Sequence, residues 1–183
     1  MRIVAGQWRG RALTAPPGLA TRPTADRVRQ ALFDMLMHAP WGGRAMLEGA
    51  LVLDVFAGTG AMGLEALSRG AARAVFVETA RPALTALLAN IAACKAEARC
   101  EVLAADALTL PPGPRADVVF LDPPYGNDLV PLALTRLRAV GRVGPGSLIV
   151  AETGRDDPLP VEAPLAERSH GAARVTVWRE GAH

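Results

Sequence analysis

The sequence lacks the features that mark disulfide-rich, metal-cluster and membrane proteins. Cys94 and Cys100 are its only cysteines, too few for a disulfide framework or a cysteine-based metal cluster. No apolar run approaches the roughly 18 residues that a membrane-spanning helix needs. The first residues contain no apolar core of a secretion signal. We therefore expect a cytoplasmic protein without a metal or a membrane partner.

Lysine is nearly absent, because Lys95 is the only one, so arginine supplies almost all positive charge. That charge is uneven: the first 44 residues hold seven arginines against two acidic residues, Asp26 and Asp34. A basic N-terminal quarter favours a polyanionic partner such as nucleic acid, although an arginine-rich solvated surface gives the same count.

The length of 183 residues and the hydrophobic share of 50% fit a globular domain and exclude disorder of the whole chain. We expect a basic N-terminal hairpin or arm over residues 1–22, with Gly6 and Gly10 at its turns. The remaining residues, 23–183, would form the main domain. Its first element would be a helix, because apolar residues recur at helical spacing from Val28 to Leu36.

From residue 51 onward, apolar strands alternate with helices. Strands are expected at residues 51–56, 74–77, 100–103, 117–121 and 147–152, and helices at 61–69, 82–93 and 129–140. A final strand at 174–178 would pair with one near Leu165. This alternation predicts a largely parallel sheet with helices on both faces.

Four successive strands end at an acidic residue: Asp54, Glu78, Asp106 and Asp122. Ligands of parallel α/β sheets bind outside the carboxyl ends of the strands. The pattern therefore predicts a binding edge carrying several carboxylates.

The first strand leads into a glycine-rich loop, Gly58-x-Gly60-x-x-Gly63, and Glu78 follows about 20 residues after Gly58. This spacing is typical of a nucleoside-containing cofactor whose ribose the acid holds. A tight turn without a ligand, NAD and S-adenosylmethionine all remain open. Asp54 favours S-adenosylmethionine, because its carboxylate could meet the ammonium of an amino-acid tail. Asp106 could hold an adenine amino group or cap a helix.

The sequence Asp122-Pro123-Pro124-Tyr125 follows the fourth strand. The prolines stiffen the turn and remove two backbone donors. The Asp122 carboxylate and the Pro123 carbonyl could then accept both hydrogens of one NH2 group, while Tyr125 stacks on the attached ring. This arrangement predicts methyl transfer to an exocyclic amine. A rigid loop with an incidental acid is the alternative.

Five segments together resemble the RsmD-type 16S rRNA guanine-N2 methyltransferases. They are residues 2–11, residues 22–29, the loop at 54–60, residues 64–71 and the motif at 122–125. The resemblance implies a class I, Rossmann-like α/β fold with a seven-stranded, mostly parallel sheet, an antiparallel last strand and an N-terminal hairpin extension. It also implies methylation of the N2 amine of a guanine of the guanine-966 type. The substrate would be 16S rRNA in the 30S subunit or its assembly intermediate.

The resemblance also implies site residues. S-adenosylmethionine would contact Asp54, Phe56, Ala57, Gly58, Gly60, Glu78, Asp106, Ala107 and Asp122. The target base would lie at Asp122, Pro123, Pro124 and Tyr125. Arg9, Arg11, Arg22, Thr24, Arg27 and Arg29 would bind RNA. The family commonly has a polar residue where this chain has Ala80, which leaves one adenosine contact open. We expect a monomer.

Three other functions remain open at this point. The same chemistry could act on adenine N6 in DNA or on a protein glutamine, although those enzymes more often have Asn at the position of Asp122. A nicotinamide oxidoreductase would leave the motif at 122–125 without a role. A non-catalytic RNA-binding assembly protein would bind RNA without turnover.

Overall fold

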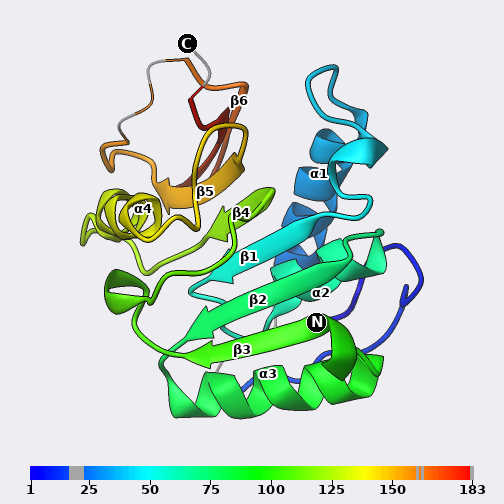
Figure 1. Ribbon diagram of the computed structural model, residues 1–183. Coiled ribbons are helices and arrows are strands. Elements are labelled where there is room, and N and C mark those ends of the chain that lie inside the picture. The colour runs from blue at the N-terminus through cyan, green and yellow to red at the C-terminus, as the bar shows by residue number, and fades with distance from the viewer. Residues whose placement is uncertain (17–22, 160, 162, 182–183) are drawn as a thin grey trace.

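The computed structural model describes residues 1–16, 23–159, 161 and 163–181 (Figure 1). These residues form one seven-stranded sheet in the order β3-β2-β1-β4-β5-β7-β6. The strands are β1 (Leu51–Val55), β2 (Arg73–Glu78), β3 (Cys100–Ala104), β4 (Val118–Leu121), β5 (Leu148–Gly154), β6 (Ala166–His170) and β7 (Ala173–Arg179). The α-helices are α1 (Pro23–His38), α2 (Ala61–Ser68), α3 (Arg81–Cys94) and α4 (Leu129–Ala139). Short 3-10 turns occupy Arg44–Met46 (η1), Glu97–Arg99 (η2) and Ala107–Thr109 (η3).

The first five strands pair in parallel, and β7 pairs antiparallel with both β5 and β6. This arrangement confirms the predicted seven-stranded, mostly parallel sheet with an antiparallel end. Every helix and strand expected from residue 51 onward is present, with ends shifted by one or two residues. The helices α2, α3 and α4 connect successive parallel strands, and a loop with η3 connects β3 to β4, because a parallel crossover must return over a face of the sheet.

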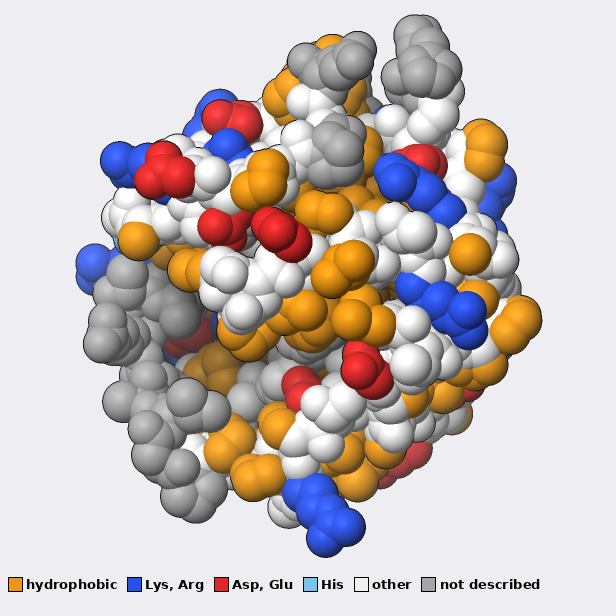
Figure 2. Space-filling view, turned by 90° about the vertical axis from the view of Figure 1, so that its left-hand side faces the viewer, with side chains coloured by type: hydrophobic (Ala, Val, Ile, Leu, Met, Phe, Trp, Pro, Cys, Tyr) orange, Lys and Arg blue, Asp and Glu red, His pale blue; other side chains and the backbone are white. Residues whose placement is uncertain are grey.

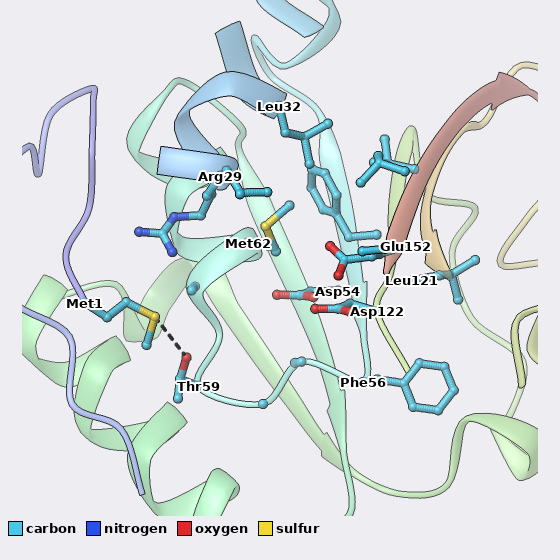
Figure 3. A pocket seen from close by; sticks show the side chains of 18 of the residues that line it. Met1, Arg29, Leu32, Asp54, Phe56, Thr59, Met62, Leu121, Asp122 and Glu152 are labelled. Atoms are coloured by element: carbon cyan, nitrogen blue, oxygen red, sulfur yellow. Dashed lines mark hydrogen bonds between the residues drawn. The ribbon is translucent and has the colours of Figure 1, made fainter. Parts of the chain in front are cut away.

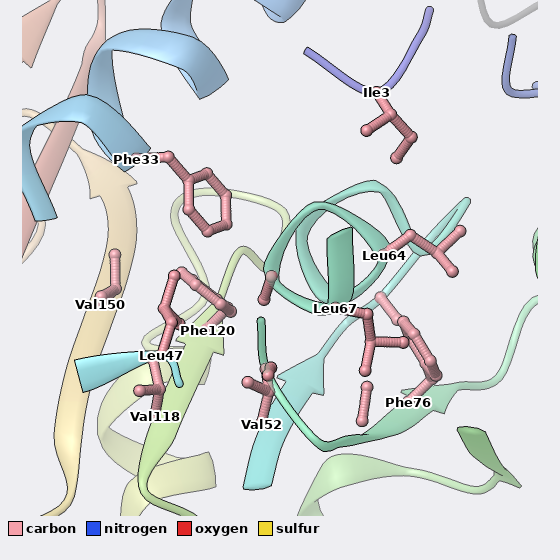
Figure 4. Close-up of a cluster of buried hydrophobic side chains, with 14 of the residues drawn as sticks. Ile3, Phe33, Leu47, Val52, Leu64, Leu67, Phe76, Val118, Phe120 and Val150 are labelled. Atoms are coloured by element: carbon pink, nitrogen blue, oxygen red, sulfur yellow. The ribbon is translucent and has the colours of Figure 1, made fainter. Parts of the chain in front are cut away.

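Alternation along each strand divides the core into two layers. On β1, Val52 faces a cluster that includes Phe33 of α1, and Leu53 faces a cluster that includes Leu134 of α4. Successive strand residues point to opposite faces, so α1, α2 and α3 cover one face while α4 covers the other (Figure 1). Figure 4 shows the first layer, where the rings of Phe33 and Phe120 lie 5.5 Å apart.

The N-terminal segment packs against the outer side of α2. Its two stretches pair antiparallel at one bridge, between Arg2 and Ala12, and three backbone hydrogen bonds flank it: Ile3 N–H to Arg11, Gly10 N–H to Ile3 and Leu13 N–H to Met1. Ile3 is fully buried in the first core layer. Two backbone N–H groups, those of Val4 and Ala5, donate to the Glu65 carboxylate of α2 at 2.8 and 3.0 Å. The predicted boundary at residue 22 lies outside the described residues, so the division into arm and domain stays a prediction.

Glu65 is the buried charge on which this packing depends. Its side chain is fully buried, and the Arg69 Nε donates to its Oε1 at 2.8 Å. The Arg29 Nε of α1 lies 3.7 Å from Oε2. One carboxylate thus joins the N-terminal segment, α1 and α2.

None of the described helices is both long and apolar enough to span a bilayer.

We expect Glu65→Ala to lower the free energy of unfolding by about 3–5 kcal/mol, because it leaves buried donors and a buried arginine without their acceptor. Urea denaturation measures this loss, and hydrogen exchange at Val4 and Ala5 should quicken before exchange in the sheet. Glu97→Ala, at an exposed glutamate of η2, is the control. Equal stability of the two variants would show that Glu65 does not anchor the segment.

Candidate functional site

A cavity of about 450 Å³ opens at the carboxyl ends of β1, β4 and β5. Figure 2 views the molecule from this edge and shows the hollow, with hydrophobic side chains around it and acidic side chains nearby. The wall comes from α1, the β1–α2 loop, β4, β5 and the β6–β7 hairpin. Its lining includes Met1, Arg29, Leu32, Asp54, Phe56, Ala57, Gly58, Thr59, Met62, Leu121, Asp122 and Glu152. A cavity of this size fits a nucleoside-sized ligand.

Asp54 lies at the end of β1 with 2% of its surface exposed. Its Oδ2 accepts a hydrogen bond from the Gly63 N–H at 2.8 Å, which ties the strand to the first turn of α2. Burial, with the Asp122 and Glu78 carboxylates adding repulsion, raises the pKa of Asp54 to about 8. No described cation is paired with it. A cationic ligand group in the cavity would lower this pKa.

The glycines of the loop are needed for steric reasons. A Cβ on Gly63 would lie 2.4 Å from the Phe76 ring, and one on Gly60 would lie 2.3 Å from Leu87 Cδ1. Gly60 also has a φ of +77° at the start of α2. Gly58 differs, because a Cβ there would meet nothing within 4 Å. Its open side and its φ of +54° present bare backbone to the cavity.

Phe56 is the strained residue of this loop. It adopts a φ of +63°, which is costly for a bulky side chain. Its ring points away from the carboxylates of Asp54, Asp122 and Glu152 (Figure 3). Ala57, the next residue, is buried on the cavity wall.

Glu78 lies beside the cavity and holds its loop. Its Oε2 accepts the Gly58 N–H at 2.8 Å, and its Oε1 accepts the N–H groups of Thr79 and Ala80 at 2.7 and 2.8 Å. Three backbone donors thus fix the carboxylate in orientation. An ionised carboxylate has about four acceptor positions, so room remains for a ligand hydroxyl.

Asp106 caps a turn. Its side chain accepts the Leu108 N–H at 2.8 Å at the start of η3, and it is exposed. Neither Asp106 nor the buried Ala107 lines the cavity. Of the two roles predicted for Asp106, the structure shows the helix cap. The adenine contact stays a prediction.

Three carboxylates meet at the centre of the site: Asp54, Asp122 and Glu152 (Figure 3). Asp122 follows β4 and is exposed where it lines the cavity. Its enclosure by protein atoms, and then the Glu152 charge, raise the pKa of Asp122 to about 7. Pro123 is buried, whereas Pro124 is exposed.

Tyr125 is 44% exposed, and its hydroxyl donates to Glu152 Oε1. Partial burial and this contact raise the pKa of Tyr125, so the phenol stays protonated. The motif thus combines a carboxylate, a rigid proline turn and an accessible aromatic ring. Such a set can accept hydrogen bonds from an amine and stack on its ring.

The predicted RNA-binding arginines lie in different environments. Arg9 and Arg27 are exposed. Arg11 is exposed too, and its Nη1 donates to the Ala93 carbonyl at the end of α3. Arg29 is 5% exposed and pairs with Asp26 at 2.9 Å. Its guanidinium lies inside the protein, on the cavity wall, rather than on the RNA-facing surface that the sequence predicts.

Two further predicted contacts have no described side chain. Arg22 lies outside the described residues, and Thr24 falls in α1 at a position whose side chain is not described. Trp8 packs on the first core layer, and the Arg99 guanidinium lies over its ring at 5.4 Å from the centroid. In the described ranges, no three His, Cys, Asp or Glu side chains are grouped to hold a metal ion.

Glu152 is the site residue that the sequence analysis missed. It lies near the end of β5, and it is the last residue of the strand expected at residues 147–152. The same rule would have found it, had the fifth strand been included.

Comparison with known proteins gives consistent matches. A family model described as "Conserved hypothetical protein 95" matches residues 1–178. Ribosomal RNA small subunit methyltransferase D of Escherichia coli strain K12 is 39% identical over 162 residues, 87% of this chain and 78% of that protein. The solved structure of the Escherichia coli protein yhhF has a TM-score of 0.84 and 35% identity, covering 100% of this chain and 99% of that one.

The fold alone is shared more widely. The ribosomal protein L11 methylase of Lactobacillus delbrueckii subsp. bulgaricus has a TM-score of 0.64 at 15% identity, covering 90% of this chain and 83% of that one. The architecture is therefore that of the class I methyltransferases, as the sequence predicts.

The raised pKa of Asp54 makes stability depend on pH. Because this pKa is about 8 in the folded protein against 3.8 for the unfolded group, folding favours the protonated acid, and stability falls as the pH rises from about 4 to about 8. Asp54→Asn keeps an acceptor for Gly63 but carries no charge. Relative to wild type, its free energy of unfolding should gain about 2–4 kcal/mol between pH 5 and pH 8.

Urea denaturation of the ligand-free protein at both pH values measures this gain. Asp156→Asn, at an exposed aspartate outside the cavity lining, should show no such change. A pH-independent difference between Asp54→Asn and wild type would contradict the burial of a titrating carboxylate.

Proposed function

The chain belongs to the RsmD family, and from this premise we propose that it is an enzyme that methylates small-subunit rRNA with S-adenosylmethionine. The finer proposal is methylation of the exocyclic N2 amine of one 16S rRNA guanine, of the guanine-966 type. The observation that carries it is the placement of Asp122 in one cavity with Asp54 and Gly58. The loop that would bind the cofactor and the carboxylate that would bind the amine thus line the same cavity.

The donor set of the site fits S-adenosylmethionine. Asp54 is a buried carboxylate at the inner end of the cavity, suited to the ammonium of the methionine part. The bare backbone of Gly58 and the compact Ala57 allow close approach at the cavity wall. Gly60 remains a proposed contact. Glu78, held by three backbone donors, would accept a ribose hydroxyl. Phe56, Asp106 and Ala107 remain proposed contacts. When bound, the cofactor supplies an electrophilic methyl group on sulfur.

The residues at 122–125 would present the amine. The Asp122 carboxylate and the Pro123 carbonyl accept its two hydrogens, which directs the nitrogen lone pair toward the methyl group. The amine nitrogen would receive the methyl group that the cofactor supplies, and it would then release one proton. A pKa of about 7 lets Asp122 take up that proton near neutral pH. Tyr125, 44% exposed, would stack on the base after it leaves its helix.

RNA would be held mainly by arginine. Arg9, Arg11 and Arg27 are exposed and available to phosphates. Arg22 and Thr24 are proposed only because they lie in a segment that resembles the family. The proposed substrate is 16S rRNA in the 30S subunit or its assembly intermediate, and the protein would act as a monomer.

The test offers labelled S-adenosylmethionine with unmethylated 30S particles, naked 16S rRNA and duplex DNA, followed by digestion and identification of the labelled nucleoside. We expect N2-methylguanosine from a ribosomal substrate. Label in N6-methyladenine from DNA would instead favour the adenine-directed alternative. Cofactor binding without label on any substrate would contradict an enzymatic role on these nucleic acids.

In this assay Asp122→Ala should lower kcat by at least about 100-fold, because the amine loses its charged acceptor. Affinity for S-adenosylmethionine, measured by calorimetry, should change by less than about tenfold, since Asp54, Gly58 and Glu78 are intact. Asp128→Ala, at an exposed residue ahead of α4, is the control. Full activity of Asp122→Ala would remove the proposed amine contact.

Replacing Arg9 and Arg11 together by glutamine should weaken rRNA binding and reduce the slope of log K against log salt by about 1–2, one for each lost phosphate contact. Filter binding at several salt concentrations measures the slope. Arg168→Gln, at an exposed arginine of β6, is the matched control. An unchanged slope would place the two N-terminal arginines outside the RNA contact.

A further inference from the structure

Glu152 occupies a position that the proposed transfer chemistry leaves unexplained. It projects from β5 into the cavity, beside the Asp122 carboxylate (Figure 3). The Tyr125 hydroxyl donates to its Oε1, so the side chain is held from within the motif at 122–125. In the described part of the chain, no donor is within hydrogen-bond distance of its Oε2. One oxygen is thus fixed and the other faces the cavity.

Two carboxylates side by side require a ligand with donors. An ionised carboxylate only accepts hydrogen bonds, and the Glu152 charge is one of the two causes that raise the pKa of Asp122. The mutual repulsion is relieved by a ligand with two neighbouring donor groups, one facing each acid. Arg29 also lines the cavity, but it pairs with Asp26 and not with either acid.

Among the amino-bearing bases of RNA, guanine alone presents two neighbouring donors. Its N2 amine lies next to the N1–H group. The adenine N6 amine lies next to the bare N1, and the cytosine N4 amine lies next to the bare N3, and both of these ring nitrogens are acceptors. A carboxylate facing either ring nitrogen would leave two lone pairs opposed, and each acceptor would lose the hydrogen bond that it makes with water.

We propose that Glu152 selects guanine by accepting its N1–H, while Asp122 and the Pro123 carbonyl accept the N2 amine. This inference rests on the proposed function and assigns the base specificity of that site to a residue of β5. Tyr125 is the positioning residue for Glu152, because its hydroxyl fixes Oε1 and leaves Oε2 toward the base. Selection against adenine and cytosine follows from the same contact.

The test replaces the target guanine by 2-aminopurine, which keeps the N2 amine but has a bare N1. The 16S rRNA is assembled by ligation with either base at the position that the wild-type protein labels, and is reconstituted into particles. Wild type should prefer guanine in kcat/KM by at least about 100-fold, because the analogue leaves Glu152 opposed to a lone pair. This comparison of the two substrates uses the wild-type protein alone.

Glu152→Gln tests the residue itself. Its amide NH2 can donate to the bare N1 of 2-aminopurine, and its amide oxygen can still accept the guanine N1–H. The preference for guanine should therefore fall to about tenfold or less, with methylation of 2-aminopurine faster than by wild type. Glu101→Gln, at an exposed glutamate of β3, should keep the wild-type preference.

The outcomes separate this inference from the proposed function. Wild type that labels guanine N2 but methylates both substrates within about threefold would overturn the role of Glu152 and leave the proposed function standing. A guanine preference that Glu152→Gln leaves unchanged would overturn it as well. Wild type that labels no ribosomal guanine would overturn the proposed function, and this inference with it.

Discussion

The crowding of Asp54, Asp122 and Glu152 around one cavity is the constraint that organises this molecule. Burial and the charges of Asp122 and Glu78 raise the pKa of Asp54 to about 8, and enclosure by protein atoms together with the Glu152 charge raises the pKa of Asp122 to about 7. No described cation pairs with Asp54 or Asp122, and Tyr125 donates to only one of the two Glu152 oxygens. The site therefore favours ligands that bring a cation to Asp54 and hydrogen-bond donors to Asp122 and the second Glu152 oxygen. A sulfonium cofactor with a free amino-acid end, such as S-adenosylmethionine, and an amino-bearing base have these groups. The unfavourable electrostatics of the site without ligands therefore favour ligands that carry these groups over ligands that lack them.

The fold creates this crowding through strand order. Residues 54, 122 and 152 are far apart in the chain, but β1, β4 and β5 are neighbours in the sheet, and parallel pairing brings their carboxyl ends to one edge. Glu65 contributes from the next layer, because it fixes the N-terminal segment and the α1 arginine, Arg29, that lines the cavity. The wall of the site therefore depends on buried ion pairs as well as on the sheet.

Much of this was predictable from the sequence, because apolar periodicity determines the strands and helices, and acids at strand ends mark the binding edge. The directions of side chains were harder to predict. Asp106 comes just after β3, as Asp122 comes just after β4, but the Asp106 carboxylate turns back to cap η3. Arg29 adds to the basic N-terminal charge, but its position on α1 points it inward, where Asp26 and Glu65 can pair with it. A count of charged residues does not show which way each side chain points. The contact between Tyr125 and Glu152 was not predictable either, because the two residues are far apart in the sequence.

The most direct test of the central claim is proton release on cofactor binding. Calorimetric titration with S-adenosylmethionine at pH 7, in two buffers of different ionisation enthalpy, gives the number of protons released per site. Asp54, protonated in the free protein because its pKa is about 8, should lose its proton when an ammonium group binds beside it. We predict release that approaches one proton and is abolished in Asp54→Asn. Binding without proton release would contradict an account based on crowded, uncompensated carboxylates.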